Sequence, residues 1–333
     1  MRLLVLGGTR FVGRAVVREA LERGWEVTAL HRGRTGSTPA GVRVLRADRT
    51  DVADLAAALS APGAGGAGWD AVVDTWSGAP RAVGDAARLL AGRAGRYAYV
   101  SSSSVYAWGR HVDEGSPLVE GDPRALEGDY PALKRGAELA ALAVFEDALL
   151  ARAGLILGPH EDVGRLPWWL LRTARGGRVV APGRPGRPLQ HVDVRDLAAW
   201  LLSGLAGGLS GAVDVAGPSG HASTADLLGA CARVTGAGAE LVWFDEDELA
   251  AAGAEPWTHL PCWVPEHGEF AGFLEADTRL AARTGLVCRP VAETVADTWE
   301  WVRREGVPPQ RPDRSVHGLP PEVERRLLSL RPG

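Results

Sequence analysis

The stretch that decides the fold is residues 3–13, Leu3-Leu4-Val5-Leu6-Gly7-Gly8-Thr9-Arg10-Phe11-Val12-Gly13. Its first four residues are apolar, which is typical of a strand buried on both faces of a parallel sheet. A helical pattern over residues 12–23 follows and ends at Gly24. Glycines between a buried strand and a helix let the backbone approach a pyrophosphate at the helix N-terminus. The stretch predicts a dinucleotide-binding turn, with candidate contacts at Gly7, Thr9, Arg10, Phe11, Val12 and Gly13.

The rest of the first half repeats this alternation of strand and helix. Short apolar strands are expected at residues 27–30, 42–45, 71–74, 97–100 and 148–151, separated by helical patterns over residues 52–59, 81–90 and 131–146. Strands that alternate with helices form parallel sheets covered by helices on both faces. We therefore predict an α/β fold: a Rossmann-type doubly wound parallel sheet with a smaller C-terminal substrate-binding domain.

The expected domain boundaries follow from where this rhythm stops. The pattern becomes irregular after residue 153, and the chain becomes rich in proline and arginine after Gly306. We predict a nucleotide-binding domain of residues 1–153 and about 189–216, a substrate-binding domain of about 154–188 and 217–306, and a Pro/Arg-rich tail of 307–333.

Composition excludes several classes of protein. A chain of 333 residues with 46% apolar and 23% charged residues has the ordinary composition of a globular protein. The net charge of −4 lacks the basic excess of a dedicated nucleic-acid binder, so we expect no nucleic-acid partner. Three widely separated cysteines indicate a reducing cytoplasm, and no apolar run is long enough to cross a membrane. We expect no metal, because prolines interrupt the only suggestive spacing, which is that of His259, Cys262 and His267.

The end of the second expected strand bears on the choice of cofactor. An acidic residue there binds the adenosine ribose of NAD, whereas arginine binds a 2′-phosphate bidentately. This chain has His31 and Arg32 at that place, and Arg10 can point to the same spot. We therefore predict NADP(H) in preference to NAD(H), with NAD(H) as the alternative; the arginines could instead reflect an arginine-rich composition. Asp48 is a candidate acceptor for the adenine amino group, and its neighbour Arg49 is included in the cofactor set.

A single lysine, Lys134, stands among 37 basic residues, and it follows Tyr130 by four positions. A composition this biased toward arginine retains a lysine where arginine cannot replace it, because only lysine can tune its pKa. Residues four apart share one helix face. An ammonium beside a phenol lowers the phenol pKa from about 10, which makes a general acid/base.

A run of four serines, Ser101-Ser102-Ser103-Ser104, lies just past the strand expected at residues 97–100. Ligands of doubly wound sheets bind beyond the carboxyl ends of the strands. A hydroxyl there can donate to a carbonyl or a developing alkoxide. The alternative is a plain serine-rich turn.

These motifs together resemble the short-chain dehydrogenase/reductase superfamily, in its extended or atypical branch of NAD-dependent epimerase/dehydratase-like proteins, over residues 1 to about 305. The resemblance implies that Ser102 binds the substrate oxygen, with Ser103 as fallback, that Tyr130 transfers the proton, and that Lys134 also holds the cofactor ribose. The segment from Arg187 to Asp193 is similar to the family's Arg-x-x-x-His-Val segment, which implies that Arg187 and His191 lie near the substrate.

The chain departs from the family pattern at two positions, of which Leu155 bears on the substrate. Leu155 stands where nucleotide-sugar enzymes of the family usually place an asparagine, and Arg10 replaces the middle glycine of the turn. The second half is also rich in tryptophan, and Trp168 and Trp257 could line a pocket or fill the core. We therefore expect a small apolar or aromatic substrate.

The function predicted from the sequence is an NADP(H)-dependent oxidoreductase of such a carbonyl or alcohol, in bacterial secondary metabolism. The alternatives are a redox-neutral epimerase or dehydratase that retains NAD(P), and a non-catalytic nucleotide-sensing or RNA-binding protein on the same fold. We expect a cytoplasmic enzyme with a small-molecule substrate. A homodimer formed by the helices near residues 137–145 and 81–90 stays open against a monomer.

Overall fold

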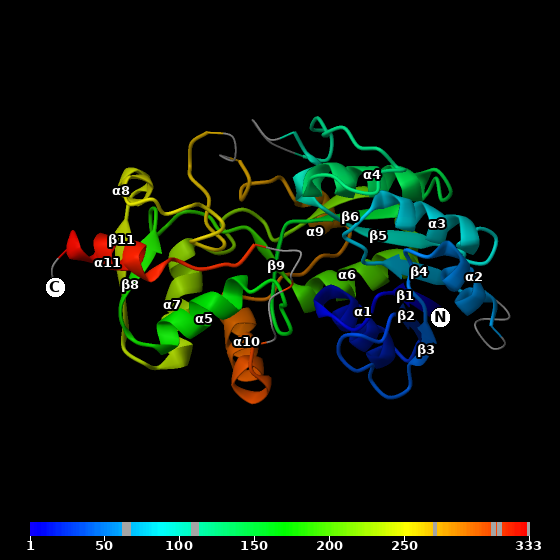
Figure 1. Cartoon of the computed structure of the whole chain (residues 1–333), viewed down its shortest axis with the longest axis horizontal. Helices are drawn as coiled ribbons and strands as arrows, with labels where there is room; N and C mark the ends of the chain where they lie inside the picture. The colour runs from blue at the N-terminus through cyan, green and yellow to red at the C-terminus, as the bar shows by residue number, and fades with distance from the viewer. Residues whose placement is uncertain (62–67, 108–112, 269–271, 308–310, 312–314, 332–333) are drawn as a thin grey trace.

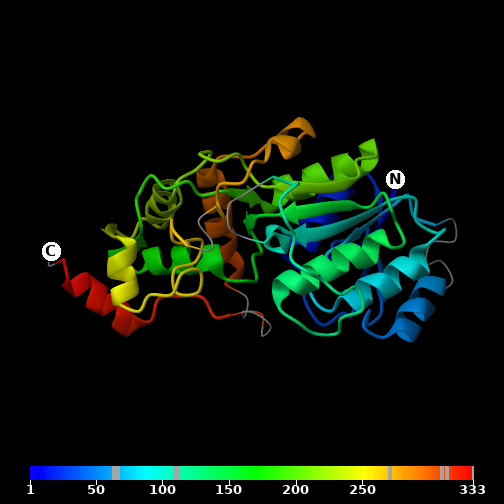
Figure 2. The same cartoon turned by 90° about the horizontal axis from the view of Figure 1, so that it is seen from above.

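The structure is a computed structural model that describes residues 1–61, 68–107, 113–268, 272–307, 311 and 315–331. Figure 1 shows two lobes, one on each side of the view, and Figure 2 shows the same two lobes from above. The right-hand lobe, which we call the sheet lobe, contains the N-terminus. The left-hand lobe, which we call the second lobe, contains the C-terminus.

Seven parallel strands form the sheet lobe, in the order β10-β6-β5-β4-β1-β2-β3. The strands are β1 (Arg2–Leu6), β2 (Glu26–His31), β3 (Arg43–Arg46), β4 (Ala71–Asp74), β5 (Tyr97–Ser102), β6 (Leu149–Ala153) and β10 (Gly211–Val215). The chain reverses its direction of travel across the sheet between β1 and β4, which is where doubly wound sheets open a ligand crevice. The predicted Rossmann-type sheet is therefore confirmed.

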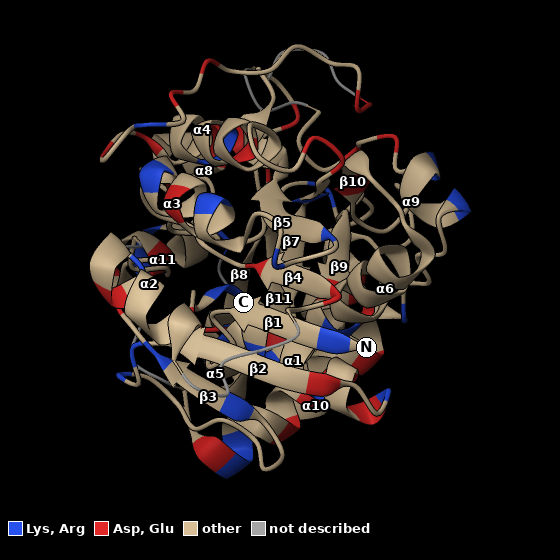
Figure 3. Cartoon of the chain, turned by 90° about the vertical axis from the view of Figure 1, so that its right-hand side faces the viewer, with Lys and Arg blue, Asp and Glu red and all other residues tan. Residues whose placement is uncertain are grey.

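Helices cover both faces of this sheet, as the end-on view in Figure 3 shows. The odd side chains of β1, Leu3 and Val5, share a core with α1 (Phe11–Glu22) and α6 (Val194–Gly207). The even ones, Leu4 and Leu6, share a core on the other face with α2 (Val52–Ser60), α3 (Pro80–Leu90) and α4 (Tyr130–Leu142). This alternation follows from the two-residue period of a strand, and it explains why β1 is apolar throughout.

The second lobe has a core of its own, which contains Trp169, Trp263 and Trp301. Its strands are β8 (Gly177–Pro182) and β11 (Ala239–Phe244), which pair in parallel. Its helices are α5 (Arg165–Ala174), α7 (Thr224–Thr235), α8 (Glu246–Ala251), α10 (Val291–Glu305) and α11 (Pro321–Ser329). The remaining elements are η1 (Ser103–Val105), α9 (Arg279–Arg283) and the parallel pair β7 (Leu155–Leu157) and β9 (His191–Asp193). The second lobe thus has a core separate from the two that cover the faces of the sheet, and the domain boundaries expected from the sequence stay a prediction.

Helices α3 and α4, which the sequence suggested for a dimer interface, pack against each other within one chain. A Cβ added to Gly84 of α3 would lie 3.6 Å from the Ala140 Cβ of α4, and Ala137 and Ala141 are fully buried. The alanines therefore serve the core of the sheet lobe, and the homodimer stays a prediction. None of the helices described here is both long enough and apolar enough to span a membrane.

Candidate active site

The glycine turn joins β1 to α1 at the carboxyl end of the sheet. Gly7 and Gly8 have φ values of 128° and 100°, which side chains rarely adopt. A Cβ on Gly13 would lie 2.6 Å from the Gly8 amide nitrogen, so only glycine lets α1 start this close to the turn. Arg10 precedes α1 and makes no side-chain cap. The turn lies at the N-terminus of α1, where free backbone N–H groups can bind an anion, and dinucleotide binding there stays a prediction.

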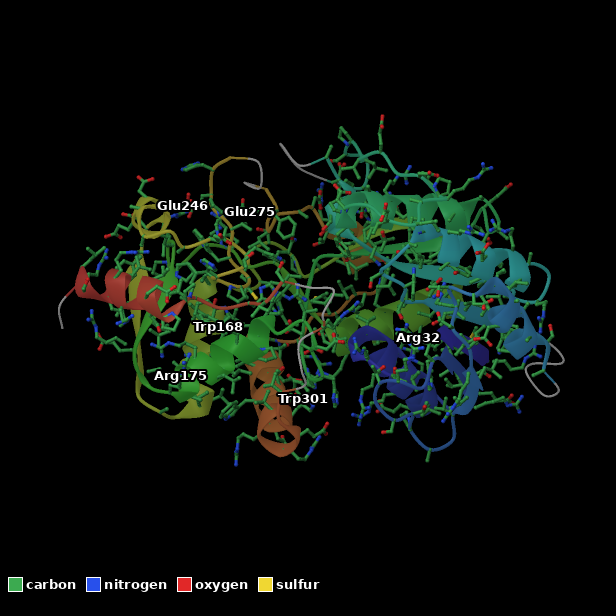
Figure 4. The ribbon with its side chains drawn as sticks, in the orientation of Figure 1. Arg32, Trp168, Arg175, Glu246, Glu275 and Trp301 are labelled. Carbon is green, nitrogen blue, oxygen red and sulfur yellow. The ribbon has the colours of Figure 1, made fainter. Side chains whose placement is uncertain are left out.

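The two arginines expected near a 2′-phosphate face different carboxylates. Arg32 Nη1 lies 3.7 Å from Asp48 Oδ2 beside the end of β2, whereas Arg10 Nη1 lies 3.5 Å from Asp162 Oδ2 in the loop after β7. Figure 4 shows Arg32 within the sheet lobe. Hydrogen bonds from Thr50, with a smaller contribution from Arg32, lower the pKa of Asp48. Arg32 and Asp48 thus lie together, while Arg10 points toward the loop after β7.

His31 lies at the edge of a cavity of about 670 Å³ beside the outer strand β3. Its Nδ1 accepts a hydrogen bond from the Gly33 amide at 3.0 Å, and its Nε2 lies 3.2 Å from Thr38 Oγ1. Burial, with a contribution from Arg46, lowers the pKa of His31 and favours the neutral imidazole. A neutral His31 contributes no charge toward a phosphate, so the cationic part of this prediction depends on Arg32.

Arg49, included in the cofactor set, is instead part of the core. Its guanidinium binds both oxygens of Asp74, at 2.6 and 2.7 Å, and Asp74 is fully buried. Tyr97 donates a third bond to the same carboxylate at 2.6 Å. Arg49 thus connects the loop before α2 to the end of β4. Its buried guanidinium is directed at Asp74, whereas a cofactor-binding residue would face the ligand.

Lys134 and Tyr130 come together above the ends of β4 and β5, as the spacing predicts. The Lys134 ammonium donates to the backbone oxygens of Trp76 and Val100, at 2.8 Å each. Its Nζ lies 4.6 Å from the ring centre of Tyr99 and 6.0 Å from that of Tyr130. Lys134 is 4% exposed, while Tyr130, the first residue of α4, is half-buried. A buried positive charge thus lies beside a phenol that solvent reaches.

The serine run ends β5 next to this pair. Ser102 is the last residue of the strand, and its Oγ accepts from the Ser104 amide at 3.2 Å. Ser103 is half-buried and begins η1. The strand extends two residues beyond the expected range of 97–100, so Ser101 and Ser102 belong to β5 and do not lie past it. Val100 of the same strand accepts a hydrogen bond from Lys134, and the role of Ser102 stays a prediction.

A buried polar network under the serines was not foreseen from the sequence. Glu138, one turn beyond Lys134, is fully buried. Its carboxylate accepts hydrogen bonds from Arg152 Nε at 2.9 Å and from Arg152 Nη2 at 3.1 Å. Ser101 Oγ donates to the same carboxylate at 2.7 Å. Arg152 also donates to Tyr106, whose hydroxyl donates to Asp214 on β10 at 2.6 Å. Locally the sequence shows only Glu138 and Arg135, which forms an ion pair with it three residues before on α4. The other members of the network, Ser101, Tyr106, Arg152 and Asp214, come from four separate segments.

Asp214 at the end of this network predicts an unusual pH dependence of stability. Its Oδ2 is buried and has no hydrogen-bond partner among the described residues. Burial, together with the charges of Glu114 and Glu138, raises its pKa to about 7, although Tyr106 and Arg152 oppose the shift. Because an unfolded aspartic acid titrates near 3.9, the native state holds the extra proton between these values, and stability falls as the pH rises through this window.

Asp214→Asn replaces the protonated carboxyl by a neutral group of the same shape. We expect the variant to lose this pH dependence. Its free energy of unfolding, measured relative to that of the unmodified protein, should therefore rise by on the order of 2–4 kcal/mol from pH 5 to pH 8. Urea unfolding at the two pH values measures it. Glu114→Gln, which removes a neighbouring charge, should give a smaller change of the same sign. Parallel pH dependences of Asp214→Asn and the unmodified protein would contradict the assignment.

The residues expected near the substrate lie in and around the second lobe. Leu155 is 1% exposed and pairs with His191, which is also buried, across β7 and β9. Trp257 is half-buried and packs edge-to-face on Phe273 at 5.2 Å. Trp168 is half-buried and packs on Trp169 at 4.6 Å. Figure 4 shows Trp168 within the second lobe. Leu155 thus belongs to the core, while Trp168 and Trp257 are partly accessible.

Arg187 is 1% exposed and surrounded by acidic side chains. Its Nη1 lies 3.6 Å from both Glu246 and Glu266, and its Nη2 donates to the Pro265 oxygen at 3.0 Å. Burial lowers the pKa of Arg187, while Glu246 and Glu275 oppose the shift. These carboxylates offset the charge that would attract an anionic substrate group. The described residues contain no cluster that could hold a metal ion.

The fold and the site together define a Rossmann-type α/β protein with the serine, tyrosine and lysine arrangement of the short-chain dehydrogenase/reductase superfamily. Residues 3–206 match the model of the NAD dependent epimerase/dehydratase family, and the chain belongs to this family. The comparison with curated proteins gives no match.

Solved structures of several bacterial enzymes share the fold. A putative epimerase from Burkholderia cenocepacia J2315 is 20% identical, with a TM-score of 0.67, over 91% of this chain and 98% of that one. The enzyme WbmH from Bordetella bronchiseptica, in complex with NAD+, is 17% identical, with a TM-score of 0.68, over 92% and 99%. The UDP-glucose 4-epimerase from Thermus thermophilus, in complex with NAD, is 20% identical, with a TM-score of 0.64, over 92% and 100%. At these identities the likeness establishes the fold.

Proposed function

We propose that the protein is a nicotinamide-dinucleotide-dependent enzyme of the epimerase or dehydratase type, in which a hydride leaves and returns to the same substrate. The observation that carries the proposal is the buried Lys134 ammonium, fixed by the Trp76 and Val100 oxygens beside Tyr130. Family membership favours this redox-neutral reaction over the net oxidoreductase that the sequence suggested. When bound, the dinucleotide supplies the hydride acceptor and donor.

The side chains of this chain supply the proton chemistry. Tyr130 takes the proton of a substrate hydroxyl as the carbonyl forms, and returns a proton when the carbonyl is reduced. Lys134 stabilises the phenolate form by its charge. Ser102 donates a hydrogen bond to the substrate oxygen, which strengthens as negative charge develops there. We retain a small apolar or aromatic alcohol or carbonyl as the substrate class. Two observations support it: Leu155 is buried, and nearby carboxylates offset the charge of Arg187.

The two reaction types differ in the fate of the hydride. A redox-neutral enzyme should copurify with a dinucleotide, which denaturation releases for chromatography, and should form product without net change in the absorbance of reduced nicotinamide. Product formed in step with that absorbance change would establish a net oxidoreductase instead. Thermal-shift screening of the dinucleotide-loaded protein should respond to aromatic ketones, and a shift with a UDP-sugar would contradict the substrate class.

Arg32 should decide between the two dinucleotides. If the guanidinium binds a 2′-phosphate, NADPH should bind about tenfold more tightly than NADH, a difference of about 1.4 kcal/mol. Arg32→Ala should remove most of that preference, and Arg34→Ala, an exposed arginine two residues on, should remove less. Calorimetric titration with both nucleotides measures the effect. The alternative is that the protein uses NAD(H), and the NAD in the complexes of the Bordetella and Thermus enzymes supports it. Equal affinities of the unmodified protein for NADH and NADPH would contradict the NADP(H) preference.

A further inference from the structure

The described residues just after α10 and just before α11 both pack on the second lobe. Just after α10, Val307 packs against the core of that lobe. Just before α11, Leu319 is buried in the same core, and the Gly318 amide donates to the Thr258 oxygen at 3.0 Å. In Figure 1 the red trace that enters α11 comes from the middle of the molecule, between the two lobes.

Arg311, between these two anchors, contacts the sheet lobe. Its Nη2 donates to Ser77 Oγ at 3.3 Å. The two residues are 234 positions apart in sequence, so this contact joins the C-terminal region to the loop that follows β4. Arg311 thereby places a guanidinium at the carboxyl end of the sheet.

Ser77 directly follows two residues that contact the glycine turn and Lys134. Thr75, two residues before it, donates its hydroxyl to the Leu6 oxygen at 3.1 Å and lies against Gly7 of the glycine turn. Trp76, immediately before it, accepts from Lys134 at 2.8 Å. A side chain that reaches Ser77 is therefore at the rim of the region between the glycine turn and Lys134.

The chemistry of this region favours a phosphate partner for Arg311. The N-terminus of α1 attracts anions, and a guanidinium binds phosphate oxygens through two parallel hydrogen bonds. We propose that Arg311, which lies between α10 and α11 in the sequence, contacts the pyrophosphate of the bound dinucleotide. The inference rests on the proposed function, since it requires that a dinucleotide occupies the site.

Binding to the full-length protein tests the inference without a known substrate. NADH, NADPH, ADP and adenosine are titrated calorimetrically into the unmodified protein, Arg311→Ala and Arg311→Lys. Arg303→Ala, which removes an exposed arginine at the end of α10, is the matched control. Unfolding midpoints of all variants show that the chain remains folded.

Arg311→Ala should weaken NADH, NADPH and ADP by about tenfold or more, as expected for a lost charge-assisted hydrogen bond. Adenosine should be unaffected, Arg311→Lys should retain part of the affinity, and Arg303→Ala should match the unmodified protein. Unchanged affinities for NADH and ADP in Arg311→Ala would overturn the inference. If Arg311→Ala lost affinity only for NADPH, the inference would be overturned, because Arg311 would then contact the 2′-phosphate and not the pyrophosphate. If the unmodified protein bound none of the nucleotides, the proposed function would fail, and the inference with it.

Discussion

Tyr130→Phe should lower turnover by roughly 10²–10⁴, the usual cost of losing a general acid/base. The substitution removes only a hydroxyl from the first residue of α4, so the fold and the dinucleotide affinity should survive. Lys134→Arg should also lose activity although it keeps the charge, because a guanidinium is larger than the ammonium that fits between the Trp76 and Val100 oxygens.

The same prediction can be checked without a substrate, because the chain has only four tyrosines. Tyr97, Tyr99 and Tyr106 are almost fully buried, and burial raises the pKa of each. A phenolate that forms below the ordinary pKa of about 10 therefore belongs to Tyr130. Ultraviolet difference spectra should show one such titration, absent in Tyr130→Phe and moved upward in Lys134→Met.

Two results would contradict the assignment of Tyr130. If Tyr130→Phe kept full turnover on the true substrate, Tyr130 and Lys134 would have no role in catalysis. A phenolate titration that Lys134→Met leaves in place would show that the ammonium does not act on the phenol.

Asp74→Asn should lower the free energy of unfolding by about 3–5 kcal/mol, because it leaves the buried Arg49 guanidinium without its counter-ion. Urea unfolding measures the loss. The matched control is Asp70→Asn at the partly exposed pair with Arg2, where about 1 kcal/mol or less is expected. The double variant Arg49→Met/Asp74→Leu should recover part of the loss, because it removes both charges together.

The pH dependence at Asp74 has the opposite sign to that at Asp214. Arg49 holds the pKa of Asp74 below its ordinary value against the effect of burial. The stability from this pair is therefore present above the ordinary aspartate pKa and is lost as the pH falls through the lower native value. If Asp74→Asn unfolded within about 0.5 kcal/mol of the unmodified protein, the pair would not have the role given to it here.

The sequence predicts the parts of this molecule that depend on local pattern. The apolar run before Gly7 gives the central strand, and the four-residue spacing of Tyr130 and Lys134 gives one helix face; both are confirmed as structure. Helix ends agree as well where a side chain caps them, as Asp51 does at the start of α2. The catalytic roles of Tyr130 and Lys134 stay predictions.

The sequence does not predict pairings between distant segments. Arg49 resembles a cofactor residue because it follows Asp48, but its partner, Asp74, is 25 positions away. Arg187 matches a family segment, yet Glu246 and Glu266, which offset its charge, come from separate parts of the second lobe. Such contacts are set by the packing of whole elements, and one sequence contains no local sign of them.

The position of β10 has a consequence for synthesis on the ribosome. A nascent chain that has reached residue 153 contains β1 to β6, but β6 still lacks its outer neighbour, which pairs Val213 with Ala151. The apolar face that α6 later covers is also open at that stage. Unpaired edges and exposed apolar faces promote aggregation, so the chain must be shielded until residue 215 has emerged. The sheet lobe therefore cannot finish folding before part of the second lobe has been synthesised. A fragment that stops at the end of β6 should be insoluble.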